Sequence, residues 1–287
     1  MNPILEKATH LIPDKLYLEL RFIQRMHKRL NLKNPQTYSE KLQWLKLYYH
    51  EPLLIKLVDK AEVKAWAAER IGEEHIIPTL GVWDSFDDID FNTLPDQFVL
   101  KCTHDSGGIC IVPDKSQFDV NAAKKKLTSR LAKNYYWHTR EWPYQFVKPR
   151  IIAEKYMVDE SGYELKDYKF FCFDGKVKYL FIATDRSVKG QETKFDFFDD
   201  QFNHLPIKNG HENADRKLAC PPGFEEMKKF AAILSKGFPE ARVDFYDIDG
   251  QVYFGEITFY HWGGLMPFEP EEWDRIFGDQ IILPKEK

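Results

Sequence analysis

Two Asp-Gly dipeptides, each between two β-rich segments, restrict what this chain can fold into more than any other feature. Asp-Gly adopts the positive φ angles of a two-residue hairpin turn, and both Asp174-Gly175 and Asp249-Gly250 stand in that context. The polar segment 103–108 joins a third strand pair. The expected pairs are 97–102 with 109–112, 168–173 with 176–183, and 241–246 with 252–258. Consecutive hairpins of this kind build antiparallel sheets.

Helical patterns dominate the start of the chain and recur between the hairpins. Thr37-Tyr38-Ser39-Glu40 has the sequence of a capping box and precedes apolar residues at helical spacing. A second such box, Asp59-Lys60-Ala61-Glu62, predicts a helix from Lys60 to Arg70, on which Lys60 and Lys64 share one face. Lysines on a helix face are usually solvated. Further helices are expected at 121–133 and 221–237, which places the chain in the α+β class rather than among parallel doubly wound sheets.

The composition excludes several classes of protein. A length of 287 residues allows one large domain or two small ones, and a net charge of −4 argues against a nucleic-acid partner. The four cysteines form no C-x-x-C pair, so neither a zinc site nor a disulfide framework is expected. Charged residues interrupt every apolar run near the N-terminus, and we therefore expect no signal peptide, no membrane span and a cytoplasmic location.

Lys101 and the loop that follows form a candidate anion site. Lys101 ends the apolar run 98–100, where a buried ammonium is costly unless it meets an anion. The loop 103–108 contains Ser106, Gly107 and Gly108, and it can turn successive backbone N–H groups toward a phosphate. The alternatives are a lysine that reaches water and a loop that is simply a turn.

A second cluster consists of Arg242-Val243-Asp244 and Glu256-Ile257-Thr258, and the hairpin register decides whether it is a site. A two-residue turn at Asp249-Gly250 would pair Asp244 with Gly255 and place Glu256 on the opposite face. A three-residue loop would pair Arg242 with Glu256 and bring all four polar side chains to one face. Two carboxylates placed there suit Mg²⁺ and phosphate. The alternative is an Arg242–Glu256 ion pair without a metal.

A third candidate is the apolar strand 151–157, which turns polar at Glu154-Lys155-Tyr156-Met157. Its end can present backbone N–H and C=O groups to an adenine edge, with a carboxylate to accept the amino group. Read alone, the segment is more often only the end of a strand.

The order of these motifs along the chain resembles the ATP-grasp superfamily. A further match, in Asn34-Pro35, 38–44 and 94–101, resembles its TupA-like branch, which acts in teichuronopeptide and surface-polysaccharide biosynthesis. The resemblance implies two antiparallel-sheet subdomains that clamp ATP, with an N-terminal helical extension. The expected segments are the extension 1–58, a first ATP-grasp segment 59–95, a lid-type nucleotide-binding subdomain 96–157 and a C-terminal subdomain with the metal site, 158–287.

The resemblance also implies a role for each matching residue. Lys60 and Lys101 would contact the α- and β-phosphates, and the loop with Ser106, Gly107 and Gly108 would close over the triphosphate. The adenine and ribose contacts would come from Glu154, the backbone of Lys155 and Met157, and Asp167, which stands where the family usually has glutamate. The Mg²⁺ ligands would be Asp244, Glu256 and Thr258, with Thr258 in place of the usual asparagine.

The implied activity is an ATP- and Mg²⁺-dependent carboxylate–amine ligase that works through an acylphosphate. Arg242 would stabilise the transferred phosphoryl group, and Lys169 and Arg186 are further basic candidates. Asp185-Arg186 and His261-Trp262-Gly263-Gly264 are candidates for γ-phosphate or acceptor contacts, or are structural. The expected substrates are an amino acid or amino sugar and a sugar-acid carboxylate. A sugar phosphotransferase, a glycosyltransferase that uses a nucleotide-sugar, a non-enzymatic nucleotide binder and a homodimer all stay open.

Overall fold

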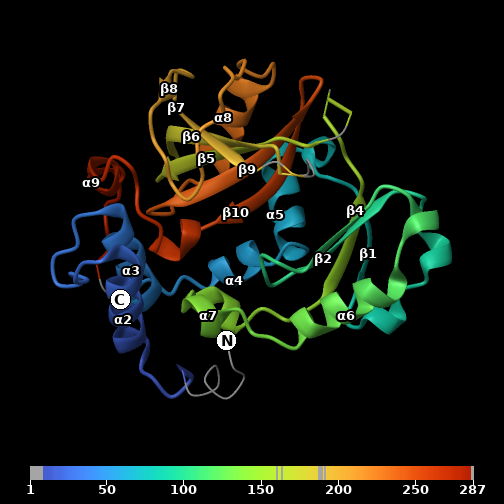
Figure 1. The fold of residues 1–287 in the computed structure, drawn as a ribbon, viewed down its shortest axis with the longest axis horizontal. Coiled ribbons are helices and arrows are strands. Elements are labelled where there is room, and N and C mark those ends of the chain that lie inside the picture. The colour runs from blue at the N-terminus through green and yellow to red at the C-terminus, as the bar shows by residue number, and fades with distance from the viewer. Residues whose placement is uncertain (1–8, 160, 163, 187–189, 191, 286–287) are drawn as a thin grey trace.

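Two antiparallel sheets, each with its own hydrophobic core, form the molecule (Figure 1). The structure is a computed structural model that describes residues 9–285 apart from 160, 163, 187–189 and 191. The smaller sheet has the order β1-β4-β2-β3, and its strands are β1 (Thr79–Trp83), β2 (Phe98–Cys102), β3 (Ile109–Val112) and β4 (Ile151–Lys155). The larger sheet has the order β10-β9-β5-β6-β7-β8, and its strands are β5 (Asp167–Phe173), β6 (Lys176–Thr184), β7 (Lys194–Asp199), β8 (His204–Leu205), β9 (Ala241–Ile248) and β10 (Gln251–Thr258). The predicted α+β class is confirmed.

The helices cover the sheets and fill the space between them. They are α2 (Asp14–Met26), α3 (Tyr38–Tyr48), α4 (Leu53–Val58), α5 (Glu62–Ile71), α6 (Val120–Leu131), α7 (Tyr136–Thr139), α8 (Phe224–Leu234) and α9 (Glu272–Gln280). Single 3₁₀ turns are η1 (Glu73–His75), η2 (Phe86–Asp88), η3 (Phe91–Thr93), η4 (Lys115–Gln117), η5 (Trp142–Gln145) and η6 (His261–Gly264). Helix α6 packs on the smaller sheet, α8 packs on the larger one, and α4 and α5 lie between the two in Figure 1. None of the described helices is long and apolar enough to cross a membrane.

The N-terminal helices belong to the core of the larger sheet. Leu42 of α3 and Leu54 of α4 are fully buried in the same cluster as Phe171 of β5 and Phe277 of α9. Helix α3 is also tied to α9, because Asp274 accepts a hydrogen bond from the Ser39 amide at 2.8 Å. The described part of segment 1–58, which was expected as an extension, therefore packs on the C-terminal part of the chain. Strand β1, from segment 59–95, pairs with β4 and so joins the sheet of segment 96–157.

Both Asp-Gly dipeptides form two-residue turns, which for Asp249-Gly250 is the shorter of the two loops left open by the sequence. Asp174 and Gly175 have φ angles of 46° and 78°, and Phe173 pairs with Lys176. Asp249 and Gly250 have φ angles of 53° and 86°, and their turn also has two residues. These positive angles suit a type I′ turn, whose twist matches that of the strands.

One capping box is confirmed and the other is incomplete. The side chains of Thr37 and Glu40 accept from each other's backbone amides at the start of α3. Asp59 accepts from the amides of Ala61 and Glu62, at 2.8 and 3.2 Å, but α5 begins at Glu62 rather than at Lys60. The Glu62 carboxylate pairs with Arg150 at 2.8 Å and does not complete the box.

Candidate functional site

One face of the larger sheet carries the second candidate cluster, and a β-bulge at Gly255 puts it there. The two-residue turn pairs Phe254 with Phe245, but Glu256 then pairs with Asp244, so that Gly255 is the extra residue. A Cβ atom on Gly255 would lie 3.0 Å from the Asp244 carbonyl oxygen, which is tighter than an ordinary Cβ contact and favours glycine. Without the bulge, alternation along the strand would have placed Glu256 on the other face. All four polar side chains share one face, although the three-residue loop that predicted this is wrong.

The Arg242 guanidinium is the centre of this cluster. It donates from Nε and Nη2 to the two oxygens of Asp244, each at 2.7 Å, and from Nη2 also to Thr258 and Glu256 at 3.0 and 3.3 Å. Its Nη1 contacts His261 Nδ1 at 2.7 Å. Burial would lower the pKa of Arg242, but the Asp244 carboxylate outweighs burial and raises it. Arg242 is therefore permanently charged, and contacts with β9, with β10 and with His261 hold its guanidinium in place.

Two other predicted cations lie beside the cluster on the same face. Lys169 of β5 contacts Asp244 directly and Asp167 at 3.4 Å. Arg186, which follows β6, contacts Asp167 and is half exposed. Burial lowers the pKa of Lys169, and Asp244 opposes that shift only in part. Asp167, expected to contact ribose, is instead engaged by Lys169 and Arg186.

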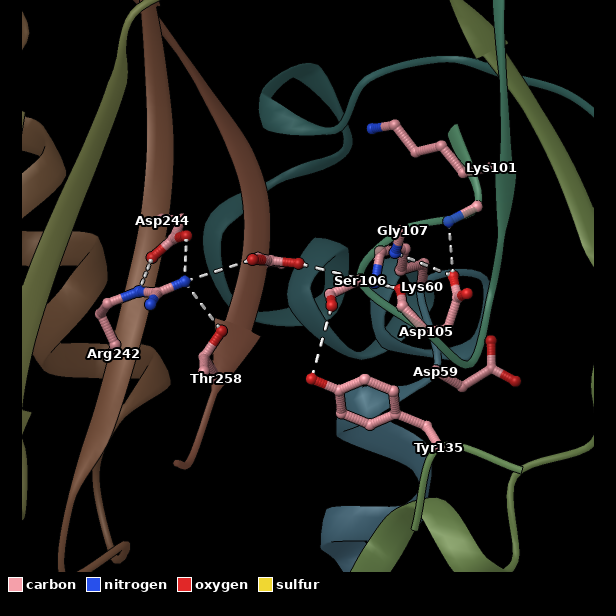
Figure 2. Close-up of polar contacts among 12 residues, drawn as sticks. Asp59, Lys60, Lys101, Asp105, Ser106, Gly107, Tyr135, Arg242, Asp244 and Thr258 are labelled. Atoms are coloured by element: carbon pink, nitrogen blue, oxygen red, sulfur yellow. Dashed lines mark hydrogen bonds and ion pairs between the residues drawn. The ribbon is translucent and has the colours of Figure 1, made fainter. Parts of the chain in front are cut away.

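Lys60 reaches from the smaller sheet's side of the molecule to the larger sheet (Figure 2). Its Nζ donates to the Asp105 carbonyl at 2.9 Å and lies 3.6 Å from Glu256. Burial alone would raise the pKa of Glu256, but Lys60, Lys169 and Arg242 together hold it well below its usual range. The side chain of Glu256 is 36% exposed, so an ionised carboxylate is open to a ligand. Figure 2 shows Arg242 and Thr258 on one side, facing Lys60 and the loop around Asp105 on the other.

Glu154 lies between two lysines. Its Oε1 is 2.5 Å from Lys64 and its Oε2 is 2.6 Å from Lys101, so the anion that Lys101 meets is this carboxylate. Burial would raise the pKa of Glu154, but both lysines outweigh burial and lower it. Since Lys64 is only 12% exposed in its side chain and also donates to the Ile77 carbonyl, the expectation that it is solvated is wrong. The Glu154 carboxylate was expected to accept a hydrogen bond from the adenine amino group, but each of its oxygens is already paired with a lysine.

The loop after β2 is shaped by Asp105. Asp105 Oδ1 accepts from the amides of Gly107 and Gly108 at 3.3 and 2.9 Å, so these two N–H groups point to a carboxylate of the loop itself. Arg130 of α6 lies 3.6 Å from the same carboxylate. Ser106 is exposed and donates to the Tyr135 hydroxyl at 3.4 Å. An anion could use the two glycine amides only by displacing Asp105.

The end of β4 carries the remaining predicted contacts. The amide of Lys155 donates to the Pro78 carbonyl at 3.0 Å and is thus occupied. Met157 follows the end of β4, and among the described residues none accepts a hydrogen bond from its amide. Of these two backbone amides, that of Met157 is the one open to a ligand.

The segments after β6 and β10 each hold one candidate residue in a buried position. Asp185 is buried and pairs with Arg216, both of its oxygens accepting at 3.0 Å, so it is structural. His261 is buried behind Arg242. Helix α3 holds the glycines of η6, because Lys46 donates to the Gly263 carbonyl at 2.7 Å. This anchoring by α3 is a role for the N-terminal helices that the sequence does not reveal.

The oxygen donors of the cluster fit a Mg²⁺ ion together with phosphate. Within the described part of the chain, no compact group of three His, Cys, Asp or Glu side chains stands ready for a metal. Mg²⁺ usually takes only one or two carboxylates and completes its octahedron with phosphate and water. Glu256 is ionised and partly exposed, whereas both oxygens of Asp244 accept from Arg242. Glu256 can therefore be a ligand as it stands, and Asp244 only after Lys169 has moved away from Oδ2, which frees a lone pair while Arg242 stays bound.

Sequence reasoning missed two residues of the cleft. The four-residue spacing of Lys64 to Lys60 is visible in the sequence, but there it predicts a solvated lysine, and Lys60 itself lies before the start of α5. Tyr135, whose hydroxyl contacts Ser106, lies in an aromatic segment with no distinguishing pattern. Burial raises the pKa of the Tyr135 hydroxyl, which stays protonated.

Two cavities lie outside this cleft, on the opposite face of the larger sheet. They measure about 230 and 500 Å³ and share Leu218. Tyr168 and Asp247 line one of them, and Asp196 and Phe198 line the other. None of the described residues that line them is a predicted site residue, so we place the candidate site in the cleft, where the charges converge.

Two antiparallel sheets that face each other across a cleft of lysines, an arginine and carboxylates are the arrangement of an ATP-grasp protein. A model of the TupA-like ATP-grasp family matches residues 40–282, and the chain belongs to this family. The predicted family and fold are thereby confirmed.

Solved structures of ligases are similar to this chain at low sequence identity. D-Alanine–D-alanine ligase from Bacillus anthracis, complexed with ATP, is 18% identical with a TM-score of 0.40, over 71% of this chain and 55% of that protein. L-Amino acid ligase from Bacillus licheniformis is 15% identical with a TM-score of 0.45, over 74% of this chain and 45% of that one. The chain thus spans about half the length of these two enzymes. A comparison with curated proteins finds no match.

Proposed function

We propose that this chain is an ATP- and Mg²⁺-dependent carboxylate–amine ligase that works through an acylphosphate. The observation that carries the proposal is the convergence of Arg242 and Glu256 from one sheet with Lys60 from the other side of the cleft. A transferring phosphoryl group needs cations on its oxygens and a metal ion held by carboxylate. Membership of the TupA-like ATP-grasp family supports the same activity.

The lysines of the cleft are the proposed phosphate contacts. Lys60 and Lys101 would bind the α- and β-phosphates, giving up Glu256 and Glu154 as partners in exchange for phosphate oxygens. The loop 106–108 would close over the triphosphate and keep water from the acylphosphate. Lys60 supports this role best, because it already bridges the loop and β10.

The end of β4 is the proposed nucleoside contact. The open amide of Met157 would donate to the adenine ring edge, and the carbonyl of Lys155 would accept from the adenine amino group. Glu154 would accept from the same amino group with the oxygen that Lys101 releases, while Lys64 stays bound to the other oxygen. Asp167 would meet the ribose after Arg186 turns toward phosphate.

The proposed Mg²⁺ ligands are Asp244, Glu256 and Thr258. When bound, Mg²⁺ would neutralise phosphate charge and hold the phosphates in line. Arg242 would stabilise the charge on the transferred phosphoryl group, with Lys169 and Arg186 beside it. The permanent charge of Arg242 suits this role, because it cannot be lost at any working pH.

The proposed substrates are a sugar-acid carboxylate and an amino acid or amino sugar, joined during surface-polysaccharide biosynthesis. The proposed segments are the extension 1–58, the first segment 59–95, the lid-type subdomain 96–157 and the C-terminal subdomain 158–287. Each of the two sheets has its own core, which supports a clamp of two units.

The test is ATP turnover with paired candidate acids and amines, followed by mass spectrometry of the products. We expect ADP, phosphate and an amide, formed only when acid and amine are both present. A phosphorylated sugar without any amide would contradict ligation and indicate a phosphotransferase. Thermal shifts should be larger with ATP and Mg²⁺ than with a nucleotide-sugar, and the reverse order would favour a glycosyltransferase.

A further inference from the structure

His261 lies directly behind Arg242 and joins it to a buried hydrogen-bond chain. Its Nδ1 contacts Arg242 Nη1 at 2.7 Å, and its Nε2 contacts Asn209 Oδ1 at 2.9 Å. Asn209 in turn donates from Nδ2 to the carbonyls of Met266 and Pro267, at 3.1 and 3.0 Å. Only 3% of His261 and 1% of Asn209 is exposed, and both ring nitrogens of His261 are occupied, so His261 faces the cleft through Arg242.

This hydrogen-bond chain determines which nitrogen of the His261 ring carries the proton. An arginine can only donate, so His261 Nδ1 must accept from Arg242. At the other end, two backbone carbonyl oxygens can only accept, so they must face the NH₂ group of Asn209. The side-chain oxygen of Asn209 then points toward His261 Nε2. The ring therefore carries its single proton on Nε2. Burial and the nearby charge of Arg242 and Lys169 lower the pKa of His261 far below its usual range, which keeps the ring neutral.

His261 also decides which hydrogen of Arg242 is free. The Nε hydrogen of Arg242 goes to Asp244, and Nη2 serves Asp244, Thr258 and Glu256. One Nη1 hydrogen goes to His261, and the other has no acceptor among the described residues. A guanidinium is planar, so fixing these contacts also fixes the direction of the remaining Nη1–H.

We propose that His261 is a positioning residue that aims the free Nη1–H of Arg242 at the transferred phosphoryl group, with Asn209 setting the tautomer that makes this possible. The inference rests on the proposed function of Arg242. It assigns His261 a role different from the γ-phosphate or acceptor contact that the motif His261-Trp262-Gly263-Gly264 suggests. Phe171 and Phe181 pack against the ring, with centroids at 5.0 and 5.3 Å, and keep it in place.

The kinetic test compares two replacements of His261. In His261→Leu the Nη1 group loses its acceptor, and we expect the rate at saturating ATP to fall about tenfold or more, with ATP affinity changed less than about threefold. In His261→Asn the amide oxygen can occupy the place of Nδ1, and we expect most of that rate to return. A purely structural role would lower thermal stability in both variants without this difference in rate.

A matched control is His75, another buried histidine, which contacts the Val252 carbonyl through Nδ1 at 2.8 Å and lies outside the cleft. His75→Leu should lower the melting temperature but leave the rate unchanged. The proposal is overturned if His261→Leu keeps the wild-type rate, if Asn restores no more than Leu, or if His75→Leu loses the same activity.

A second measurement needs no catalysis. The ¹⁵N shifts of the wild-type His261 ring at neutral pH should show a proton on Nε2 and a bare Nδ1, and Asn209→Ala should mix the tautomers. A proton on Nδ1 in the wild type would refute the proposal directly. If the wild-type chain turned over no ATP, the proposed function would fail, while the ring spectrum would still accept or refute the hydrogen-bond chain.

Discussion

Asp244 of β9 lies directly opposite Glu256 of β10, and this pairing exists only because Gly255 bulges out of the hairpin. The bulge brings two carboxylates to one face, where the Arg242 guanidinium lies between them at 2.7 and 3.3 Å. Like charges opposite each other destabilise a sheet unless a cation separates them. The arginine serves that purpose here, and a metal with phosphate would add to it in the proposed complex.

Replacing Glu256 by glutamine should abolish ATP turnover, with a loss of roughly 100-fold or more if the carboxylate holds the metal. The fold should survive, because the side chain is 36% exposed and glutamine keeps its shape. Steady-state ATP turnover and the melting temperature are the two measurements. Glu225→Gln, at an exposed ion pair with Lys228, is the control, and a Glu256 variant as active as this control would contradict the metal role.

Substituting Gly255 should disturb the register of β10. A Cβ atom there would meet the Asp244 carbonyl at 3.0 Å and the Tyr246 ring at 3.2 Å. We expect Gly255→Ala to cost about 1–3 kcal/mol and Gly255→Val more, because the strands cannot separate without losing ladder bonds. Urea denaturation measures the loss, and ATP binding should weaken in step. Equal stability of the wild type and the valine variant would mean that the bulge is dispensable.

Lys64→Met should destabilise the protein at neutral pH, by roughly 1–3 kcal/mol, because Glu154 loses one of its two cations in a buried site. The lowered pKa of Glu154 means that its contribution is present above the unfolded pKa of about 4.3 and is lost as pH falls through the folded value. The difference between variant and wild type should therefore shrink in acid. Denaturation curves between pH 7 and pH 3 test this, with the exposed Lys125→Met as control. A pH-independent difference would contradict the ion pair.

Asp105→Ala should loosen the loop after β2, since the amides of Gly107 and Gly108 lose their acceptor. We expect faster hydrogen exchange at both amides and a stability loss of about 1 kcal/mol. Asp105→Asn keeps the accepting oxygen and should keep the protection. Unchanged exchange in the alanine variant would show that the loop is held by other contacts.

Much of the fold was predictable from short stretches of sequence. Asp174-Gly175 and Asp249-Gly250 form their turns because the positive φ angles are a property of those residues and need no partner. The Thr37 capping box likewise closes within four residues. The order of polar motifs along the strands indicated the family, which the model match over residues 40–282 confirms.

Tertiary contacts decided the rest of the candidate site. The bulge at Gly255 sets which residue of β10 pairs with Asp244 of β9. This register depends on the neighbouring strand and not on the turn alone. Lys64 is buried because Glu154, far along the chain, lies beside it. His261 has no ring nitrogen left for a ligand in the cleft, because Arg242 and Asn209 occupy both of them. Turn and cap geometry are set within a few residues, so the sequence alone determined them, whereas register and charge partners depend on which distant segments pack together.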